Sequence, residues 1–340
     1  MKRLISILFL TAGLVACDNF EIDHPDFDYT SGFFPYQFPV RTLVLGDYIY
    51  DNANDNAHKF VISAAMGGVY ENDRNRAFTI EVDNSLCNDI WFTAAGPQIE
   101  AMPANYYTLS SATQLVIPAG KMNGGVEVQL SDAFFSDPKA ITLGYVVPLQ
   151  LKSSNDVDTI LTGSSPNPAA DQRIASQWNV APKNFTMFAV KYVNEFHGTY
   201  FQYGASQVKD ASNAAVESTT YSEKYVENNQ TVRLATSARY QVSTSINLKS
   251  AVMTGSVGLL LTFNGNACTV SAPAGSAYTI SGTGTFKPKA WEWGNKKRDG
   301  IELTYTISKD GNTYTATDVL VIRDRGIVME TYSPTLQAAG

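Results

Sequence analysis

Apolar and polar residues alternate along most of the chain with a period of two. Phe78, Ile80 and Val82 alternate with polar residues, and residues 126–130 repeat the arrangement. Because successive side chains of a strand point to opposite faces, each run predicts a half-buried β-strand. Further strands are predicted over residues 40–45, 60–64, 115–117, 141–151 and 185–193.

The second half of the chain continues this pattern between short polar turns. Asp310 and Gly311 join two alternating runs, and this dipeptide suits the positive φ angles of a tight hairpin turn. Seven or eight sequential strands with short links predict a closed up-and-down barrel, which has no exposed edge. These strands are expected over residues 199–202, 231–236, 240–248, 258–263, 278–286, 301–308 and 313–323.

Two domains are expected, because the 340-residue chain is longer than one hydrophobic core usually organises. We predict an immunoglobulin-like antiparallel β-sandwich over residues 40–195, followed by the barrel domain over residues 196–340. The Ser/Pro/Asn-rich residues 153–183 then form a loop inside the first domain, before its last strand.

The first residues are typical of an export signal. Lys2 and Arg3 precede an apolar run over residues 4–15 that is too short to span a bilayer. The sequence Leu14-Val15-Ala16-Cys17 resembles the lipobox of bacterial lipoproteins. We therefore predict a signal peptide over residues 1–16 and lipidation of Cys17, whose acyl chains would hold the protein on a membrane. The alternative is an ordinary secretory signal that ends near a cysteine.

Residues 17–39 are expected to form an acyl-anchored tether and an extended lead-in. The acidic run over residues 18–23 resembles the export signal that sends Bacteroidetes lipoproteins to the outer face of the outer membrane. A plain solvated linker is the alternative. The expected location is therefore the outer membrane, with the lipid-anchored protein facing the cell exterior.

Composition narrows the possible partners. The formal net charge of −7 and the small number of clustered Lys and Arg residues argue against a nucleic-acid partner. No apolar run after Cys17 is long enough to cross a bilayer, so membrane attachment is expected through the acyl anchor only. Cys87 and Cys268 are predicted to be buried apolar residues, with an interdomain disulfide as the alternative.

The sequence carries no recognisable catalytic signature. His24, His58 and His197 have no nucleophile in a recognisable elbow, so a catalytic triad is not expected. No pattern selects the carboxylate pair that a glycosidase needs. The oxygen-rich residues 51–56 lack the ligand spacing of a calcium loop, which favours a solvated turn. We predict no metal, no cofactor and no enzymatic activity.

Aromatic residues are the better binding candidates, because flat rings cover the apolar C–H faces of sugars while nearby polar groups bond the hydroxyls. Trp291 and Trp293 occupy positions i and i+2, which places both rings on one side of a strand. The alternative is that both rings fill the barrel core while the following charged run is a solvated loop. The candidate ligand-binding residues are Trp291, Trp293, Asn295, Lys296, Arg298 and Tyr203.

Several separated motifs resemble one protein family. Its N-terminal domain is matched by GGVYEN (67–72), YYTL (106–109), IPAGKM (117–122), DAFF (132–135) and WNVAPKNF (178–185). FHGTY (196–200) resembles the start of the second domain, which is lipocalin-like in this family. The family consists of Bacteroidetes surface lipoproteins first catalogued as being of unknown function, and no catalytic residue belongs to these motifs.

Relatives in this family are commonly encoded beside outer-membrane glycan-import machinery, and some join the same N-terminal domain to a glycoside hydrolase. The resemblance therefore implies non-catalytic glycan binding at the cell surface, in support of polysaccharide or glycoprotein-glycan uptake. The main alternative is an adhesin-like or structural module that binds a protein of the import complex. A glycoside hydrolase is the third possibility.

Overall fold

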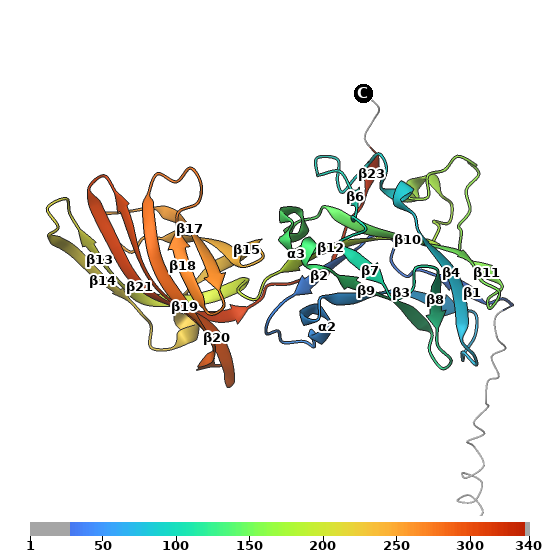
Figure 1. Ribbon diagram of the computed structural model, residues 1–340, viewed down its shortest axis with the longest axis horizontal. Helices are drawn as coiled ribbons and strands as arrows, with labels where there is room; N and C mark the ends of the chain where they lie inside the picture. Colours follow the sequence, from blue (N-terminus) through green and yellow to red (C-terminus); the bar gives the residue numbers. More distant parts are fainter. Residues whose placement is uncertain (1–27, 337–340) are drawn as a thin grey trace, which may run out of the picture.

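The computed structural model describes residues 28–336, so the predicted signal peptide (1–16), Cys17 and the acidic run lie outside the described residues. The predicted all-β class is confirmed, with an N-terminal β-sandwich followed by a closed antiparallel barrel. The two domains lie end to end along the long axis of the molecule (Figure 1). No helix within residues 28–336 is long and apolar enough to cross a membrane.

The sandwich contains a five-stranded sheet and a seven-stranded sheet. The first sheet has the order β11 (Thr159–Ile160), β1 (Ser31–Phe33), β3 (Lys59–Gly67), β9 (Asn123–Leu130), β7 (Tyr107–Leu109). The second has the order β22 (Glu330–Thr331), β2 (Pro39–Val44), β12 (Phe185–Val193), β10 (Tyr145–Ser153), β4 (Arg76–Val82), β8 (Gln114–Ile117), and β6 (Glu100–Ala101) also pairs with β10.

The remaining elements of the sandwich are short. β5 (Ile90–Trp91) pairs with β23 (Thr335–Leu336). The helices are α2 (Ala53–Asn56), α3 (Asp132–Ser136) and the 3-10 turns η1 (Asn84–Cys87), η2 (Pro138–Ile141) and η3 (Ala175–Gln177). The predicted lead-in is shorter than expected, because β1 pairs with β3 and β11 and so belongs to the sandwich.

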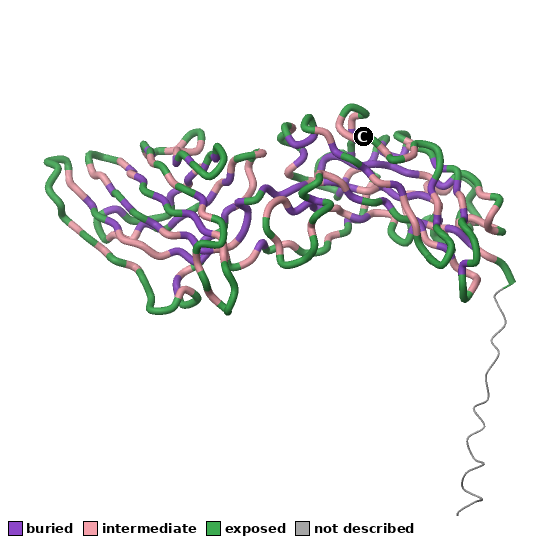
Figure 2. The backbone as a smooth tube through the Cα atoms, turned by 60° about the horizontal axis from the view of Figure 1, so that its bottom comes forward, coloured by how far each residue is buried: buried purple, intermediate pink, exposed green. Residues whose placement is uncertain are grey.

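Strand β12 is buried on both faces, which creates two packed layers in the first domain. Val190 and Tyr192 face the main core between the two sheets. Phe185 and Met187 face a second core, which is covered by residues 86–101 and by Tyr332 from the end of the chain. Figure 2 shows buried positions running along the strands of both domains, while the loops are exposed.

The barrel closes because its first strand pairs with its last. It contains β13 (Gly198–Lys209), β15 (Gln230–Ala238), β16 (Gln241–Asn247), β17 (Ser256–Asn264), β18 (Ala267–Ser271), β19 (Thr279–Trp293), β20 (Lys296–Lys309) and β21 (Asn312–Asp324). β14 (Ala215–Tyr221) pairs with the far half of β13, and η4 (Val226–Asn228) follows it. Residues of β13 from Thr199 to Lys209 pair with β21 and complete the ring.

The predicted barrel pattern is confirmed at its last hairpin. Ile301, Leu303 and Tyr305 face the barrel core, and Asp310 and Gly311 have the positive φ angles of 52° and 82° that the turn requires. Four side chains also form a buried polar group inside the barrel. Asp318, 2% exposed, accepts hydrogen bonds from Gln202, Tyr221 and Tyr305, and burial raises the pKa of its carboxyl.

Two connections link the domains. The first runs from the end of β12 at Val193 to the start of β13 at Gly198. The second leaves β21 at Asp324 and returns to the sandwich, where Glu330 and Thr331 pair with β2. The prediction that the barrel domain extends to residue 340 is therefore wrong for residues 330–336. These residues lie outside the barrel because strand pairing with β2 and β5 attaches them to the first domain.

Candidate ligand-binding site

The predicted tryptophan residues lie on a hairpin arm formed by the ends of β19 and β20. Its register is irregular between Lys287 and Trp291, and Gly294 and Asn295 form the turn with φ angles of 57° and 56°. Trp293 is paired with Lys296 across the arm. Asn295 and Lys296 are exposed at the tip of the arm.

The arm folds against the outside of the barrel rather than filling it. The indole N–H of Trp293 donates to the backbone oxygen of Ile322 over 3.0 Å, and its ring meets Phe201 edge-on at 5.3 Å. Trp291 lies against Gly300, where an added Cβ would come within 2.6 Å of its ring. Neither tryptophan belongs to the barrel core, so the core-filling alternative is wrong. Both rings are only partly exposed.

The four remaining candidates are divided between two places. Tyr203 interacts with Trp291, and burial raises the pKa of its hydroxyl. The guanidinium of Arg298 lies over the Trp293 ring, 4.1 Å from its centre. The structure thus brings together Tyr203, Trp291, Trp293 and Arg298, and leaves Asn295 and Lys296 at the exposed tip.

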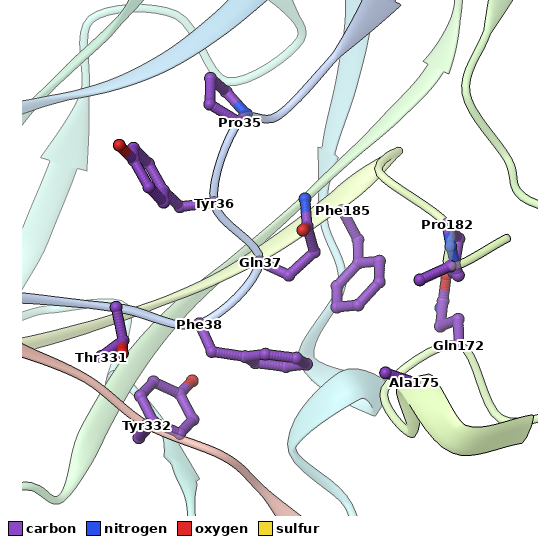
Figure 3. A pocket seen from close by; sticks show the side chains of 11 residues that line it. Pro35, Tyr36, Gln37, Phe38, Gln172, Ala175, Pro182, Phe185, Thr331 and Tyr332 are labelled. Carbon is purple, nitrogen blue, oxygen red and sulfur yellow. The ribbon is translucent and has the colours of Figure 1, made fainter. Parts of the chain in front are cut away.

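A pocket of about 330 Å³ lies in the first domain, far along the chain from the tryptophan pair. Its rings are Tyr36, Phe38, Phe185 and Tyr332, and the amides of Gln37 and Gln172 lie beside them (Figure 3). We call this the aromatic pocket. The remaining lining residues are Pro35, Ala175, Ala181, Pro182 and Thr331, so no charged side chain lines it.

Three distant segments build the aromatic pocket, and main-chain hydrogen bonds hold them together. The Met187 N–H donates to the oxygen of Gln37 over 2.7 Å, and the Tyr332 N–H donates to the oxygen of Phe38 over 3.1 Å. The hydroxyl of Tyr332 donates to the oxygen of Met187 over 2.7 Å. The returning end of the chain therefore completes a pocket that the start of the chain begins.

The loop that supplies Gln172 is also fixed. Arg173 binds the carboxylate of Asp171 with Nη2 at 2.6 Å, and its Nη1 donates to the oxygens of Leu86 and Asn88. The hydrogen bond from Arg173 holds the pKa of the Asp171 carboxyl below its usual value. The Trp178 indole donates to the oxygen of Asp171 over 2.8 Å. The pocket wall is therefore preorganised, which limits the entropy lost when a ligand binds.

The aromatic pocket was not predicted from the sequence, although two features of the sequence pointed toward it. The lead-in before β2 is rich in proline and aromatic residues, and the long connection between β10 and β12 contains only the short strand β11 and the 3-10 turn η3. Long ordered connections with little regular secondary structure are often functional. Which rings would meet could not be predicted, because Tyr332 comes from the opposite end of the chain.

The other sequence motifs have structural roles. In the oxygen-rich run, Asp55 accepts from the Val44 N–H and pairs with Arg41, while Asn52 donates to the oxygens of Val44 and Gly46. Cys87 and Cys268 are buried and free, which confirms their predicted burial and excludes the disulfide alternative. Burial raises the pKa of the Cys87 thiol to about 12.

His197 lies near the start of β13, where its Nδ1 accepts from the Thr236 N–H over 3.0 Å. Burial, with a contribution from the Arg233 charge, lowers the pKa of its imidazole to about 3. His58 packs against Phe135, and burial lowers its pKa as well. Within residues 28–336 there is no cluster of His, Cys, Asp and Glu that could hold a metal ion.

Each of the two domains matches a known protein family over part of the chain. A family described as a domain of unknown function, DUF5627, matches residues 195–326, and an N-terminal domain family matches residues 27–158. No curated protein matches the chain.

Solved structures of three Bacteroides ovatus proteins are similar to it. A protein of unknown function is 34% identical with a TM-score of 0.85, and the match covers 92% of this chain and 100% of that one. A multidomain protein including DUF1735 is 12% identical with a TM-score of 0.39, covering 88% and 97% of the two chains. A candidate carbohydrate-binding protein is 12% identical with a TM-score of 0.29, covering 91% and 100%. Similarity as remote as the last two carries no conclusion about this chain. The barrel matches the DUF5627 model, and the chain belongs to the same family as the first of these proteins, whose function is unknown.

Proposed function

We propose that this protein is a non-catalytic, lipid-anchored glycan-binding protein of the outer membrane, facing the cell exterior in support of glycan uptake. The aromatic pocket is the observation that carries this proposal. Its rings offer apolar faces for the C–H surfaces of a sugar, and its amides can both donate and accept hydrogen bonds with hydroxyl groups.

The chemistry of the aromatic pocket favours a neutral sugar. No side chain of Asp, Glu, Lys, Arg or His lines it, so it offers no partner for a charged ligand. Gln172 takes part in no side-chain hydrogen bond among the described residues, which leaves its amide available. Tyr36 is 56% exposed and presents its ring at the edge of the pocket. A neutral glycan chain could therefore bind with one residue inside and the rest in solvent.

The proposal that the protein is exported and lipid-anchored is based on residues 1–23. The lipobox-like sequence ending at Cys17 supports lipid attachment, and the acidic run supports transfer to the outer face of the outer membrane. Metabolic labelling with a clickable fatty acid tests attachment, and Cys17→Ser provides the control. Proteinase digestion of intact cells then tests surface exposure, and protection of the protein in intact cells would contradict it.

Glycan binding is tested with the soluble chain that starts at Asp18. We expect hits on a glycan array to be neutral oligosaccharides, and calorimetry should then show that Tyr36→Ala and Gln172→Ala each weaken binding by about tenfold. Tyr225→Ala is the matched control, because Tyr225 is similarly exposed at 54% but lies on the barrel. Unchanged affinity in both pocket variants would overturn the assignment of this pocket.

The hydrolase alternative is tested on the same glycan by mass spectrometry. The proposal expects every bound oligosaccharide to remain intact after prolonged incubation. The carboxyl of Asp299 is the group to examine if cleavage occurs, because burial raises its pKa and a glycosidase needs such a proton donor. Any cleavage that Asp299→Asn abolishes would replace the binding role with an enzymatic one.

An exposed apolar group supports the second candidate function, which is binding to a protein of the import complex. Ile49, Tyr50, Val328 and Met329 are 69%, 68%, 69% and 78% exposed, the highest values among the large apolar side chains of residues 28–336. Contiguous exposed apolar side chains often mark protein interfaces. Cross-linking on intact cells tests this role, and Val328→Ser with Met329→Gln should abolish any specific cross-linked partner.

A further inference from the structure

A second hollow lies between the two domains and has a different chemistry. This interdomain cleft has a volume of about 360 Å³. Its walls are the loop after β2, which supplies Tyr48 and Tyr50, the base of the hairpin arm with Arg298, and the chain that leaves β21 with Arg325. Ligand sites often form at domain interfaces, where two surfaces supply different groups.

Arg325 is a buried cation without a carboxylate partner. Arg325 is only 5% exposed. Its guanidinium donates hydrogen bonds to the backbone oxygens of Leu45 (2.9 Å), Asp47 (2.9 Å) and Asn194 (2.6 Å). Its Nε has no hydrogen-bond partner among the described residues. Burying a charge without a counterion is unfavourable, so a bound anion would offset this loss.

Arg298 is the second cation at the cleft that lacks a carboxylate. It takes part in no ion pair within residues 28–336, and its buried Nε has no hydrogen-bond partner there. Stacking on Trp293 at 4.1 Å fixes the plane of its guanidinium. A guanidinium held in this way is preorganised for a planar anion such as a carboxylate, which it can bind through two parallel hydrogen bonds.

Two of the acidic side chains that line the cleft have cationic partners. Asp324 is paired with Arg323 at 2.8 Å, and Asp47 lies 3.5 Å from the ammonium of Lys289. Asp299 accepts from the Lys289 N–H over 2.8 Å, and burial raises the pKa of its carboxyl. Two cations at the cleft, Arg298 and Arg325, therefore take part in no ion pair among the described residues, and the carboxyls of Asp299 and Glu195 near Arg325 take part in none either.

We propose that the interdomain cleft binds the carboxylate of a hexuronic acid residue in a glycan chain. Arg298 and Arg325 supply the positive charge for the carboxylate, and the rings of Tyr48 and Tyr50 supply apolar faces for the sugar. This site is separate from the aromatic pocket and uses none of its residues. The protein would then recognise an acidic sugar at one place and a neutral sugar at another.

The test is calorimetry on the soluble chain from Asp18 with a galacturonic acid trisaccharide and with the matched neutral galactose trisaccharide. We expect the cleft to bind the acidic sugar, and Arg298→Gln to weaken that binding by about tenfold or more. Arg298→Lys keeps the charge but loses the planar fork. The affinity of this variant for the acidic sugar should therefore lie between that of the wild type and that of Arg298→Gln. Lys297→Gln is the control, because Lys297 is the exposed neighbour of Arg298 on the same strand.

Two further measurements separate this site from simpler explanations. Tyr50→Ala should weaken binding of the acidic trisaccharide but leave acetate binding unchanged, and equal affinity for acetate and the trisaccharide would overturn the sugar assignment. Absence of acidic-sugar binding, or an Arg298→Gln variant that binds normally, would overturn the proposal altogether. Neutral-glycan binding through Tyr36 and Gln172 is measured separately, so failure at one site does not decide the other.

Discussion

The aromatic pocket and the interdomain cleft are of similar volume, but uncharged residues line the pocket whereas charged residues line much of the cleft. The aromatic pocket has four rings, two amides and no charged lining residue, and main-chain hydrogen bonds within one domain hold it. The cleft lies where two domains meet and contains two arginines without carboxylate partners. The comparison shows that the hollow between the domains is lined by charged groups, whereas the hollow within the sandwich is lined by none.

The largest expected effect comes from Arg325→Met, which should affect the cleft and spare the aromatic pocket. The substitution removes three charge-assisted hydrogen bonds between the domains and leaves the oxygens of Leu45, Asp47 and Asn194 without this donor. We expect the free energy of unfolding to fall by about 3 kcal/mol or more. Urea denaturation followed by tryptophan fluorescence measures this change.

The same variant separates the two sites. Affinity for the acidic trisaccharide should fall at least tenfold, while the neutral oligosaccharide should bind to the aromatic pocket as before. A variant with wild-type stability would show that Arg325 does not join the domains. Loss of both affinities would mean that the two sites are coupled, contrary to the comparison.

A smaller effect is expected from Trp293→Ala. Trp293 packs against Phe201 and lies beneath Arg298, so its removal frees the guanidinium and exposes part of the barrel wall. We expect acidic-sugar affinity to fall by about tenfold and the circular dichroism of the strands to remain. Trp291→Ala is the control, since Trp291 contacts Gly300 and Tyr203 instead. Equal loss in both variants would favour direct ring contact with sugar, as the sequence analysis proposed.

The smallest effect is the pH dependence of the two sites. Burial raises the pKa of the Glu195 and Asp299 carboxyls near Arg325, so these groups become neutral at a higher pH than usual. Asp47 and Asp324 keep Lys289 and Arg323 as partners. As the pH falls through the raised pKa values, repulsion of the ligand carboxylate decreases while both arginines remain charged.

Affinity for the acidic trisaccharide should therefore be about threefold higher at a pH below the raised pKa values of Glu195 and Asp299 than at about pH 8. Neutral oligosaccharide should bind equally at both values, because no Asp, Glu, Lys, Arg or His lines the aromatic pocket. Calorimetry at the two pH values measures both ligands. A decrease in acidic-sugar affinity on acidification would contradict the assignment of Arg298 and Arg325 as the anion partners.

The local pattern of the chain was enough to predict the barrel. Ile301, Leu303 and Tyr305 alternate with polar residues, and Asp310-Gly311 specifies a tight turn, so both strand faces and the hairpin follow from neighbouring residues. The sandwich was also predictable as a class, from alternation such as that of Phe78 and Ile80. Strand pairing over long distances was not, because nothing local connects Glu330 with Val40.

The candidate sites, too, could be predicted only as far as neighbouring residues determine them. Trp291 and Trp293 were predicted to share a face, but the irregular register after Lys287 turns that face onto the outer wall of the barrel. The alternation of side chains along a strand does not predict that the hairpin arm packs against the barrel. Arg298 was identified as a binding candidate, but its position at the cleft depends on Tyr48 and Arg325, which are brought near it only by the tertiary fold.

The return of the chain from the barrel to the sandwich also constrains the order of synthesis. Domains generally begin to fold as they are made, from the N-terminus onward. Here Tyr332 and strand β22 follow the whole barrel in the sequence, although they belong to the first domain. A chain that ends before Thr331, or that has not yet been synthesised to Tyr332, would therefore lack one wall of the aromatic pocket, even when all other strands of the sandwich are present.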